Sequence, residues 1–393
     1  MSKSFADLGI SRELAGALKR LEITEPFPIQ RMVVPDVLAG HDVLAQSPTG
    51  SGKTIAFTAP ILDRIDLGAK RPAALVLAPT RELAAQIVDQ ARPLASARNL
   101  QILAVYGGVG IEPQIRKASR AHMLVATPGR LLDLLDRRAL TLEHVQVAVL
   151  DEADRMLDMG FRPDVERILD RTPRKRQTLL FSATLQGEVG QLAKRYTQNA
   201  KRHENAPAEG SRPQIDHRFV PVVHDRKVDA LVSELRERED GLALIFVRTR
   251  RGADRLVKRL DSKGVRAAAM HGGKSQGNRT RTLSDFEKGR VDALIATDVA
   301  ARGIDVSGIS HVINYDPPED REGYVHRIGR TARAGRSGVG VTFVMDDQAH
   351  DVGRIARDLD LRSEFAAVRS NGHEARVSRN RSAARPRRGR HGR

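Results

Sequence analysis

The sequence of 393 residues contains no cysteine and no tryptophan, and aromatic residues make up only 4% of it. The absence of cysteine excludes disulfides, thiolate metal sites and cysteine nucleophiles. Apolar runs such as residues 74–78 are far shorter than the ~20 residues of a membrane span. The start, MSKSFADLGI, lacks the apolar stretch of a signal peptide. We therefore expect a soluble cytoplasmic protein that does not associate with membranes.

Basic residues outnumber acidic ones: the sequence has 66 Lys and Arg and 49 Asp and Glu, which gives a net charge of +17. Such an excess is typical of proteins that bind a polyanion, either nucleic acid or an anionic membrane. Residues 369–393 alone hold nine arginines and one glutamate. A segment of this composition cannot bury enough apolar surface to offset its ordering entropy. We predict a disordered basic tail over residues 364–393, and a solubilising end without a partner is the alternative.

Short runs rich in Val, Ile, Leu and Ala alternate with amphipathic stretches along most of the chain. The runs cover residues 42–46, 73–78, 100–106, 122–126, 145–150, 177–181, 242–247, 265–270, 291–296, 309–315 and 338–345. Runs that are apolar on both faces and alternate with helices predict buried parallel strands of α/β domains. A polar break at 203–213 contains two prolines and a glycine and predicts a linker. The expected fold class is thus α/β, with parallel-sheet domains over 1–202 and 214–363 that bind ligands at the carboxyl ends of their strands.

The first run leads into SPTGSGKT, residues 47–54, and then into a predicted helix. Gly50 and Gly52 let backbone amide groups face an anion at the positive end of that helix. Lys53 can reach the β and γ phosphates of a nucleotide, and the Thr54 hydroxyl can hold Mg²⁺. A glycine-rich turn that only caps the helix is the alternative. The lysine directly before threonine favours the nucleotide site.

The run at 145–150 ends in DEAD, residues 151–154. A carboxylate at the end of a strand, here Asp151, can orient Mg²⁺, partly through water. The next carboxylate, Glu152, can polarise a water molecule for in-line attack on the γ-phosphoryl group. The alternative is an acidic cap on a helix. The preceding strand, and the position after the phosphate loop, favour a catalytic role.

Together these motifs resemble those of the DEAD-box family of ATP-dependent RNA helicases, superfamily 2, of bacterial type. The resemblance covers about residues 5–345. Its motifs occur in the family's order: Phe5 upstream of PFPIQ (26–30), SPTGSGKT (47–54), PTRELA (79–84), Gly107–Gly108, TPGR (127–130), DEAD (151–154), SAT (182–184), IFVRT (245–249), Gln276 with Arg279, TDVAARGID (297–305) and YVHRIGRTARAGR (324–336). The resemblance implies two RecA-like domains, ATP hydrolysis with Mg²⁺, and RNA bound across both domains.

The resemblance also implies a role for each matched residue. The implied ATP-binding residues are Phe5, Ile23, Gln30, Ser47, Pro48, Thr49, Gly50, Ser51, Gly52, Lys53, Thr54, Gly303 and Asp305. Gln30 would contact the edge of adenine, and a solvated glutamine is the alternative. The implied catalytic residues are Lys53, Asp151, Glu152, Arg330 and Arg333. The two arginines would reach the γ-phosphate and stabilise transition-state charge. The alternative for these arginines is a basic patch that binds only RNA phosphates. Ser182 and Thr184 are expected to bond to the DEAD segment, and His326 and Arg327 to bind RNA phosphates or the SAT segment.

The implied RNA contacts are small groups, hydroxyls, backbone amides and guanidinium groups. They come from Pro79, Thr80, Arg81, Gly108, Thr127, Pro128, Gly129, Arg130, Arg248, Arg279, Thr297 and Asp298. Such groups suit the sugar–phosphate backbone, and contacts to the 2′-OH select RNA. The scarcity of aromatic residues argues against base stacking. We expect binding that is independent of RNA sequence.

The chain departs from the family pattern at several positions of the nucleotide site. Ile23 replaces an aromatic residue that stacks on adenine, Phe27 replaces Thr, and Ser47 replaces Ala. Glu22 and Ala332 each stand where glycine is usual. These changes bear on nucleotide affinity more than on mechanism.

The resemblance implies an RNA-stimulated ATPase that unwinds short RNA duplexes locally or remodels RNA–protein complexes as its two domains close. It further implies a monomer whose protein partners are ribosomal or RNA-decay proteins. Two alternatives stay open: a DNA helicase or translocase of the same superfamily, and a non-enzymatic RNA clamp or annealing protein that depends on the basic tail. Comparing RNA with DNA as activator of the ATPase distinguishes the DNA helicase or translocase. The absence of RNA-stimulated ATP turnover would support the non-enzymatic protein.

Overall fold

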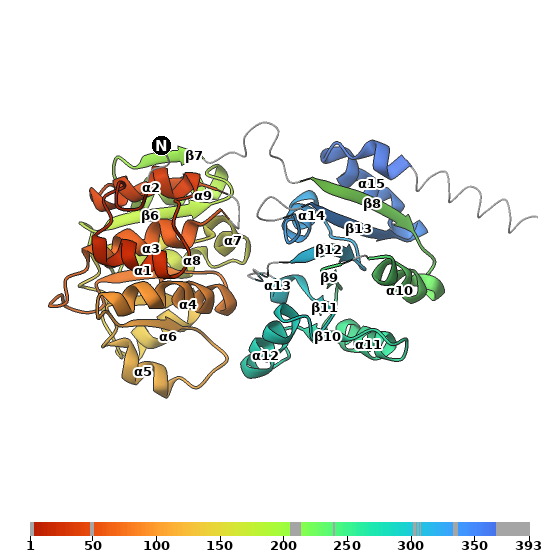
Figure 1. Ribbon diagram of the computed structural model, residues 1–393, viewed down its shortest axis with the longest axis horizontal. Coiled ribbons are helices and arrows are strands. Elements are labelled where there is room, and N and C mark those ends of the chain that lie inside the picture. Colours follow the sequence, from red (N-terminus) through yellow and green to blue (C-terminus); the bar gives the residue numbers. More distant parts are fainter. Residues whose placement is uncertain are drawn as a thin grey trace, which may run out of the picture. The chain divides into compact units, whose positions relative to one another are not determined.

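The computed structural model describes residues 4–47, 51–204, 214–238, 240–301, 304, 306, 308–332 and 337–366. These residues form two compact units, each built around its own sheet (Figure 1). Unit 1 contains residues 4–204, and unit 2 contains the described parts of 214–301 and 306–366. Every pairing between neighbouring strands is parallel, which confirms the prediction of parallel sheets in two RecA-like domains.

Unit 1 has a seven-stranded sheet in the order β3-β4-β2-β5-β6-β1-β7. Its strands are β1 (Val43–Gln46), β2 (Ala74–Leu77), β3 (Ile102–Val105), β4 (Met123–Ala126), β5 (Val147–Leu150), β6 (Gln177–Ser182) and β7 (Lys201–Glu204). Its helices are α1 (Arg12–Arg20), α2 (Pro28–Leu38), α3 (Lys53–Arg64), α4 (Arg81–Ala97), α5 (Glu112–Ala118), α6 (Pro128–Asp136), α7 (Ala153–Asp158), α8 (Arg162–Leu169) and α9 (Gly187–Tyr196).

The central strands of unit 1, β2, β4, β5 and β6, bury both of their faces in two separate hydrophobic clusters. In β2, Ala74 and Val76 pack with α1, α2, α3 and α4, whereas Leu75 and Leu77 pack with α6, α7, α8 and α9. Successive side chains of a strand point to opposite faces of a sheet, so an uninterrupted apolar run fills both clusters. This is why these strands show no polar alternation in the sequence.

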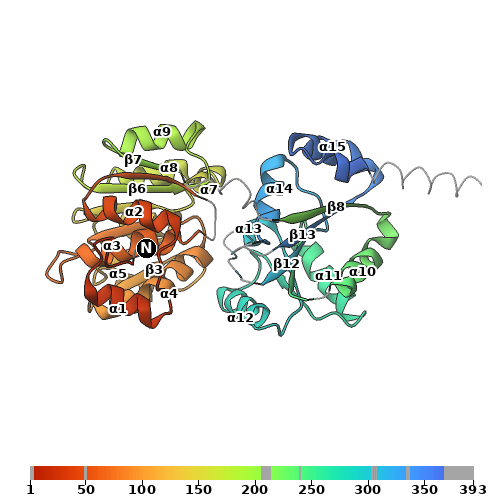
Figure 2. The ribbon, with the colours of Figure 1, turned by 45° about the horizontal axis from the view of Figure 1, so that its top comes forward.

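Unit 2 has a six-stranded sheet in the order β10-β11-β9-β12-β13-β8. Its strands are β8 (Ile215–Pro221), β9 (Leu242–Phe246), β10 (Ala267–Met270), β11 (Ala293–Ala296), β12 (Ile309–Asn314) and β13 (Gly338–Val344). Its helices are α10 (Lys227–Glu237), α11 (Arg250–Asp261), α12 (Gln276–Glu287), α13 (Asp298–Ala301), α14 (Arg321–Ile328) and α15 (Ala349–Asp358). Figure 2 shows α10 and α11 on one side of these strands and α12, α13 and α14 on the other.

Two predicted boundaries are wrong by a few residues. His203 and Glu204, assigned to the linker, continue β7, where parallel pairing with β1 supplies the backbone partners that their polar side chains do not suggest. Residues 364–366, assigned to the tail, lie in a helical turn. Phe365 anchors this turn, since it is buried and its ring lies 5.4 Å from that of Phe219. The rest of the predicted linker and tail, residues 205–213 and 367–393, lies outside the described residues.

Within the described ranges, no helix has the length and apolar character that crossing a membrane requires.

Candidate active site

The predicted phosphate loop connects β1 to α3 in unit 1. Ser47 follows β1, and its backbone N donates to Ser182 O at 3.0 Å. Its side-chain oxygen lies 2.5 Å from that of Ser51. Gly52 has a φ of 87°, which lies in the left-handed region and favours glycine. Pro48, Thr49 and Gly50 lie outside the described residues.

Lys53 opens α3 and is buried, with its Nζ 3.4 Å from Ser47 O. The ammonium group is thereby folded back over the start of its own loop. Thr54 is the second residue of α3, so its hydroxyl lies in the first helical turn. An ammonium group, a hydroxyl and a helix N-terminus at one loop form a site for polyanions.

Gln30 joins the predicted adenine-binding segment to this loop. Its side chain is completely buried, so the alternative of a solvated glutamine is wrong. Its Oε1 accepts from Phe27 N at 2.8 Å, and its Nε2 donates to Gly52 O at 2.9 Å. Phe5 is buried and Ile23 half-buried in the neighbouring hydrophobic cluster. Gln30 therefore links the start of α2 to Gly52, the residue that precedes the phosphate-binding helix.

Asp151 follows β5 directly and is almost fully buried, with 2% of its surface exposed. Burial raises the pKa of Asp151 to about 6, although the nearby positive charge of Lys53 opposes the rise. The Oδ1 atom accepts from Glu152 N at 3.0 Å. A carboxylate held in this way, beside a buried lysine, marks a site built for a charged ligand.

Glu152 occupies the left-handed region, with φ 51° and ψ 53°, at the start of α7. Its carboxylate forms an ion pair with Arg155, one turn further along that helix, and both side chains are buried. Sequence reasoning did not single out Arg155. The signal available was its spacing of three residues from Glu152, which places two side chains on one helical face.

The SAT segment bonds to the DEAD segment, as predicted for Ser182. Ser182 Oγ accepts from Asp154 N at 3.3 Å, and Asp154 Oδ2 accepts from Ala183 N at 2.9 Å. Because β6 lies between β5 and β1 in the sheet, this segment sits between the acidic residues and the phosphate loop. The Thr184 hydroxyl makes a different bond from the predicted one, accepting from Gln186 N at 3.3 Å.

The order of strands separates two groups of predicted residues in unit 1. The nucleotide group follows β1 and β5, with the SAT segment after β6 between them. The RNA group follows β2, β4 and β3, which are adjacent at the other end of the sheet. It comprises Pro79, Thr80 and Arg81 after β2, Gly108 after β3, and Thr127, Pro128, Gly129 and Arg130 after β4.

The two arginines of this RNA group meet at the loop after β3. A side chain at Gly108, whose φ is 81°, would overlap the guanidinium group of Arg81. The same group and that of Arg130 both lie beside Gly107. Arg130 also donates to Val109 O at 3.2 Å. The structure therefore brings Arg81, Gly108 and Arg130 together, and a glycine at 108 leaves room for them.

In unit 2 the predicted RNA contacts again follow adjacent strands. Arg248 follows β9, Thr297 and Asp298 follow β11, and Arg279 lies in the first turn of α12 after β10. Arg248 has an exposed side chain, and its backbone N donates to Asp316 Oδ2 at 2.8 Å. Arg279 is largely buried.

Asp298 forms a two-pronged ion pair with Arg327, at 2.6 Å to Nε and 2.7 Å to Nη2. Arg327 Nη1 also donates to Asn314 Oδ1 at 3.1 Å and to Asp316 O at 2.7 Å. The guanidinium group is thus occupied by acceptors of its own unit. In this structure Arg327 connects α13, β12 and α14, and its expected contact with RNA phosphates or the SAT segment stays a prediction.

Arg330 follows α14 and is buried, with its Nε 3.3 Å from His326 O. Arg333, Gly303 and Asp305 lie outside the described residues. Sequence reasoning missed the buried Lys227 and the half-buried Asp316, which form an ion pair of 2.8 Å beside Arg248. These two residues lie outside every motif, so no local pattern identifies them.

Residues 27–192 match the DEAD/DEAH box helicase family, and residues 226–335 match the helicase conserved C-terminal domain. A DEAD-box ATP-dependent RNA helicase, CshA of Geobacillus kaustophilus, is 41% identical over 92% of this chain and 78% of its own length. The chain belongs to the DEAD-box ATP-dependent RNA helicases. The ATP-dependent RNA helicase CshA of Listeria monocytogenes is 43% identical over 86% of this helicase and 66% of its own length.

Two solved structures share the fold of this helicase. S. cerevisiae Dbp5 bound to RNA and ADP BeF3 superimposes with a TM-score of 0.82 and 33% identity, over 92% of this chain and 94% of Dbp5. Mss116p bound to ssRNA and AMP-PNP superimposes with a TM-score of 0.79 and 29% identity, over 91% of this chain and 78% of Mss116p. Both of these proteins are bound to an RNA together with a nucleotide analogue.

Proposed function

We propose that this helicase separates short RNA duplexes locally, or remodels RNA–protein complexes, by an ATP-driven closure of its two domains. The observation that carries the proposal is the division of the unit 1 sheet. One end of its carboxyl edge holds Lys53 and Asp151, and the other end holds Arg81 and Arg130. ATP and RNA would therefore bind side by side at one edge of one sheet, with Asp151 after β5 next to the RNA group that begins after β2.

ATP would bind with its phosphates at the start of α3. Lys53 would hold the β and γ phosphates, and the backbone of residues 47–52 would surround them. Gln30 and Ile23 would contact adenine, beside Phe5. Gly303 and Asp305 would meet the ribose. The bonds from Gln30 to Phe27 N and Gly52 O support this placement, because they fix the adenine-binding segment to the loop.

Asp151 and Thr54 would hold Mg²⁺, partly through water. Their carboxylate and hydroxyl oxygens are the ligands Mg²⁺ prefers. Burial raises the pKa of Asp151, so a nearby cation would favour its ionised form. Among the described residues no cluster of three or more His, Asp or Glu side chains could enclose a metal. Mg²⁺ is commonly bound by one or two carboxylates together with substrate phosphates. When bound, Mg²⁺ would neutralise charge on the phosphate oxygens.

Glu152 would polarise the attacking water, and Arg155 would hold its carboxylate in place. Arg330 and Arg333 would stabilise the charge that develops on the γ-phosphoryl group when the domains close. Since ATP and RNA would both favour the closed form, each should strengthen binding of the other.

RNA would be bound through its sugar–phosphate backbone by the twelve residues named above, without reading of sequence. Dbp5 and Mss116p, which share the fold, are described as bound to RNA or ssRNA. We further propose that the protein acts as a monomer in the cytoplasm, with ribosomal or RNA-decay proteins as partners.

Purified protein with a short labelled RNA duplex tests the proposed function. Strand separation should require ATP and should be lost in Lys53→Ala, which lacks the charge that holds the phosphates. ATP turnover should rise with RNA and not with DNA of the same sequence. Turnover that DNA stimulates equally would instead favour a DNA translocase, and strand separation by Lys53→Ala would favour an annealing or clamping protein.

A further inference from the structure

A cavity of about 650 Å³ opens at the amino-terminal edge of the unit 1 sheet. Arg71 precedes β2, Ser119 precedes β4, and Thr141 precedes β5, and all three line it. Because the strands are parallel, loops that precede them lie at the edge opposite to loops that follow them. The cavity is therefore separate from the edge that holds the predicted ATP and RNA residues.

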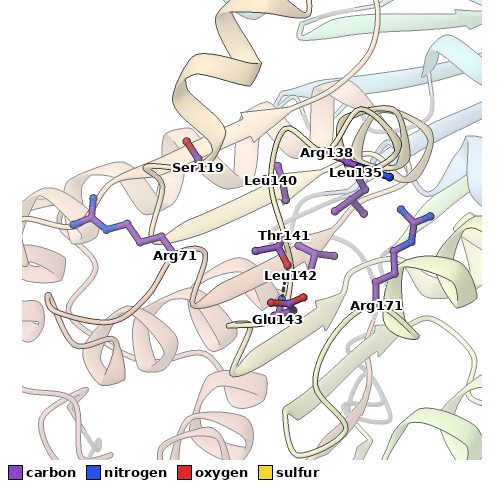
Figure 3. A pocket seen from close by; sticks show the side chains of 9 residues that line it. All are labelled: Arg71, Ser119, Leu135, Arg138, Leu140, Thr141, Leu142, Glu143 and Arg171. Atoms are coloured by element: carbon purple, nitrogen blue, oxygen red, sulfur yellow. Dashed lines mark hydrogen bonds between the residues drawn. The ribbon is translucent and has the colours of Figure 1, made fainter.

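The cavity combines an apolar floor with a basic rim. Figure 3 shows Leu135, Leu140 and Leu142 between Arg71 on one side and Arg138 and Arg171 on the other. Leu135 and Leu142 belong to the buried cluster beneath, so this floor is fixed. Arg171 is held by Asp136 at 2.8 Å, and Arg71 Nη1 donates to Arg120 O at 2.9 Å.

A second cavity of about 330 Å³ adjoins the first, since Glu143 lines both. It adds Lys70 and Lys175 to the basic residues. Together the two cavities are lined by five Lys or Arg residues (Arg71, Arg138 and Arg171 with Lys70 and Lys175) and by one carboxylate, Glu143. The basic residues thus extend over two adjoining cavities, which is more than one small molecule would occupy. A chain of phosphates needs such an extended positive surface.

We propose that these two cavities, the amino-edge surface, bind single-stranded RNA that extends beyond the track at the opposite edge. The inference rests on the proposed function, because it assumes that RNA is bound at the carboxyl edge. Guanidinium groups suit phosphate oxygens, and the hydroxyls of Ser119 and Thr141 suit the ribose 2′-OH. A base can pack on the leucine floor, since roughly 300–1,000 Å³ is the size of pockets that hold small ligands such as one nucleotide.

The amino-edge surface acts only on RNA long enough to reach both edges of the sheet. A bound strand at one edge raises the effective concentration of its extension at the other. A short oligonucleotide occupies the carboxyl edge alone and gains nothing. The dependence of affinity on RNA length therefore separates this surface from the catalytic track.

The test compares two full-length variants that lose the same charge. One carries Arg138→Gln, Arg171→Gln and Lys175→Gln on the amino-edge surface. The matched control carries Arg12→Gln, Lys19→Gln and Arg20→Gln, which replace three exposed residues of α1. Affinity for a short and a long single-stranded RNA is measured over a range of salt concentrations, together with ATPase stimulation by the short RNA.

The amino-edge variant should bind long RNA about tenfold more weakly, with a salt slope reduced by up to about 2, or about 0.7 for each lost phosphate contact. Its affinity for short RNA and its ATPase stimulation should match the control. Equal losses in both variants, or unchanged binding of long RNA, would overturn the proposal. The second result would leave an acidic protein as the ligand of this surface. An unmodified protein whose ATPase ignores RNA would instead defeat the proposed function, so the two failures are distinguishable.

Discussion

Lys227 Nζ lies 2.8 Å from Asp316 Oδ1, and the lysine side chain is only 5% exposed. The other carboxylate oxygen of Asp316 accepts from Arg248 N, and its backbone O accepts from Arg327. Arg327 in turn holds Asp298. The ion pair of the buried Lys227 with Asp316 thus connects α10 to the segments that carry two predicted RNA contacts, Arg248 and Asp298. The ammonium group also lies 4.2 Å from the centre of the Tyr315 ring, which keeps it in place.

Lys227→Met should raise the RNA concentration that half-stimulates ATP turnover, by roughly tenfold. The substitution keeps the side-chain length but leaves the half-buried carboxylate of Asp316 without its lysine, so the loop of Arg248 loses its fixed position. Turnover at saturating RNA should fall much less. ATPase titrations with RNA measure both quantities.

Two further variants separate positioning from stability. Lys227→Arg keeps the charge and should restore most of the RNA affinity. Lys263→Met removes a lysine of the same unit whose ion pair with Asp229 is exposed, and should change nothing. If Lys227→Met lowered the melting temperature but left the RNA requirement unchanged, the pair would be structural only.

Gln30→Ala should raise the ATP requirement and reduce the preference for ATP over GTP. Its amide is expected to discriminate adenine, and its bonds to Phe27 N and Gly52 O order the phosphate loop. Ile23→Phe should tighten ATP by about 0.5–1.5 kcal/mol through an added aromatic contact. Nucleotide titrations of the three proteins check this, and an unchanged ATP-over-GTP preference in Gln30→Ala would contradict it.

Ala332→Gly should raise the free energy of unfolding by up to about 1 kcal/mol. Ala332 has a φ of 55° at a position where the family usually has glycine, and Glu22, the other such position, has a φ of 61°. Asn99→Gly is the control, since asparagine tolerates its φ of 53° better than alanine does. Chemical denaturation measures all three proteins. An equal gain from Asn99→Gly would show that left-handed strain at Ala332 is not the cause.

Asp151→Asn should stabilise the nucleotide-free protein at neutral pH, by something on the order of 2 kcal/mol. Burial raises the pKa of Asp151 to about 6, so the folded protein binds a proton more tightly than the unfolded chain does. Wild-type stability attributable to this group therefore falls as pH rises from about 4 to about 6, and is constant above. Thermal unfolding without Mg²⁺ should show the advantage of Asp151→Asn shrinking as pH falls below 6. An advantage that does not vary with pH would refute the assignment.

Each apolar run named from the sequence forms a strand, because a strand buried on both faces must be apolar throughout. The sequence did not reveal β7 and β8, which lie at sheet edges and mix exposed polar residues with few apolar ones. Their pairing depends on the neighbouring strand rather than on local composition.

In the candidate site, too, local sequence patterns predict some features and not others. Positions that follow strands, such as Lys53, Asp151 and Arg81, could be placed at one edge because parallel strands end together. The partners of these residues could not. Lys227 and Asp316 are 89 residues apart, and only the folded sheet brings them together. Arg327 shows that a motif residue can also have partners within its own domain that the motif does not reveal.

The central claim is that Glu152 activates the water that attacks ATP bound beside RNA. The measurement that tests it most directly is ATP turnover by Glu152→Gln at saturating RNA, alongside binding of ATP and RNA to the same protein. We predict that both ligands still bind, each strengthening the other, while turnover falls by about 10²-fold or more because the general base is lost. Normal turnover by purified Glu152→Gln would contradict the account.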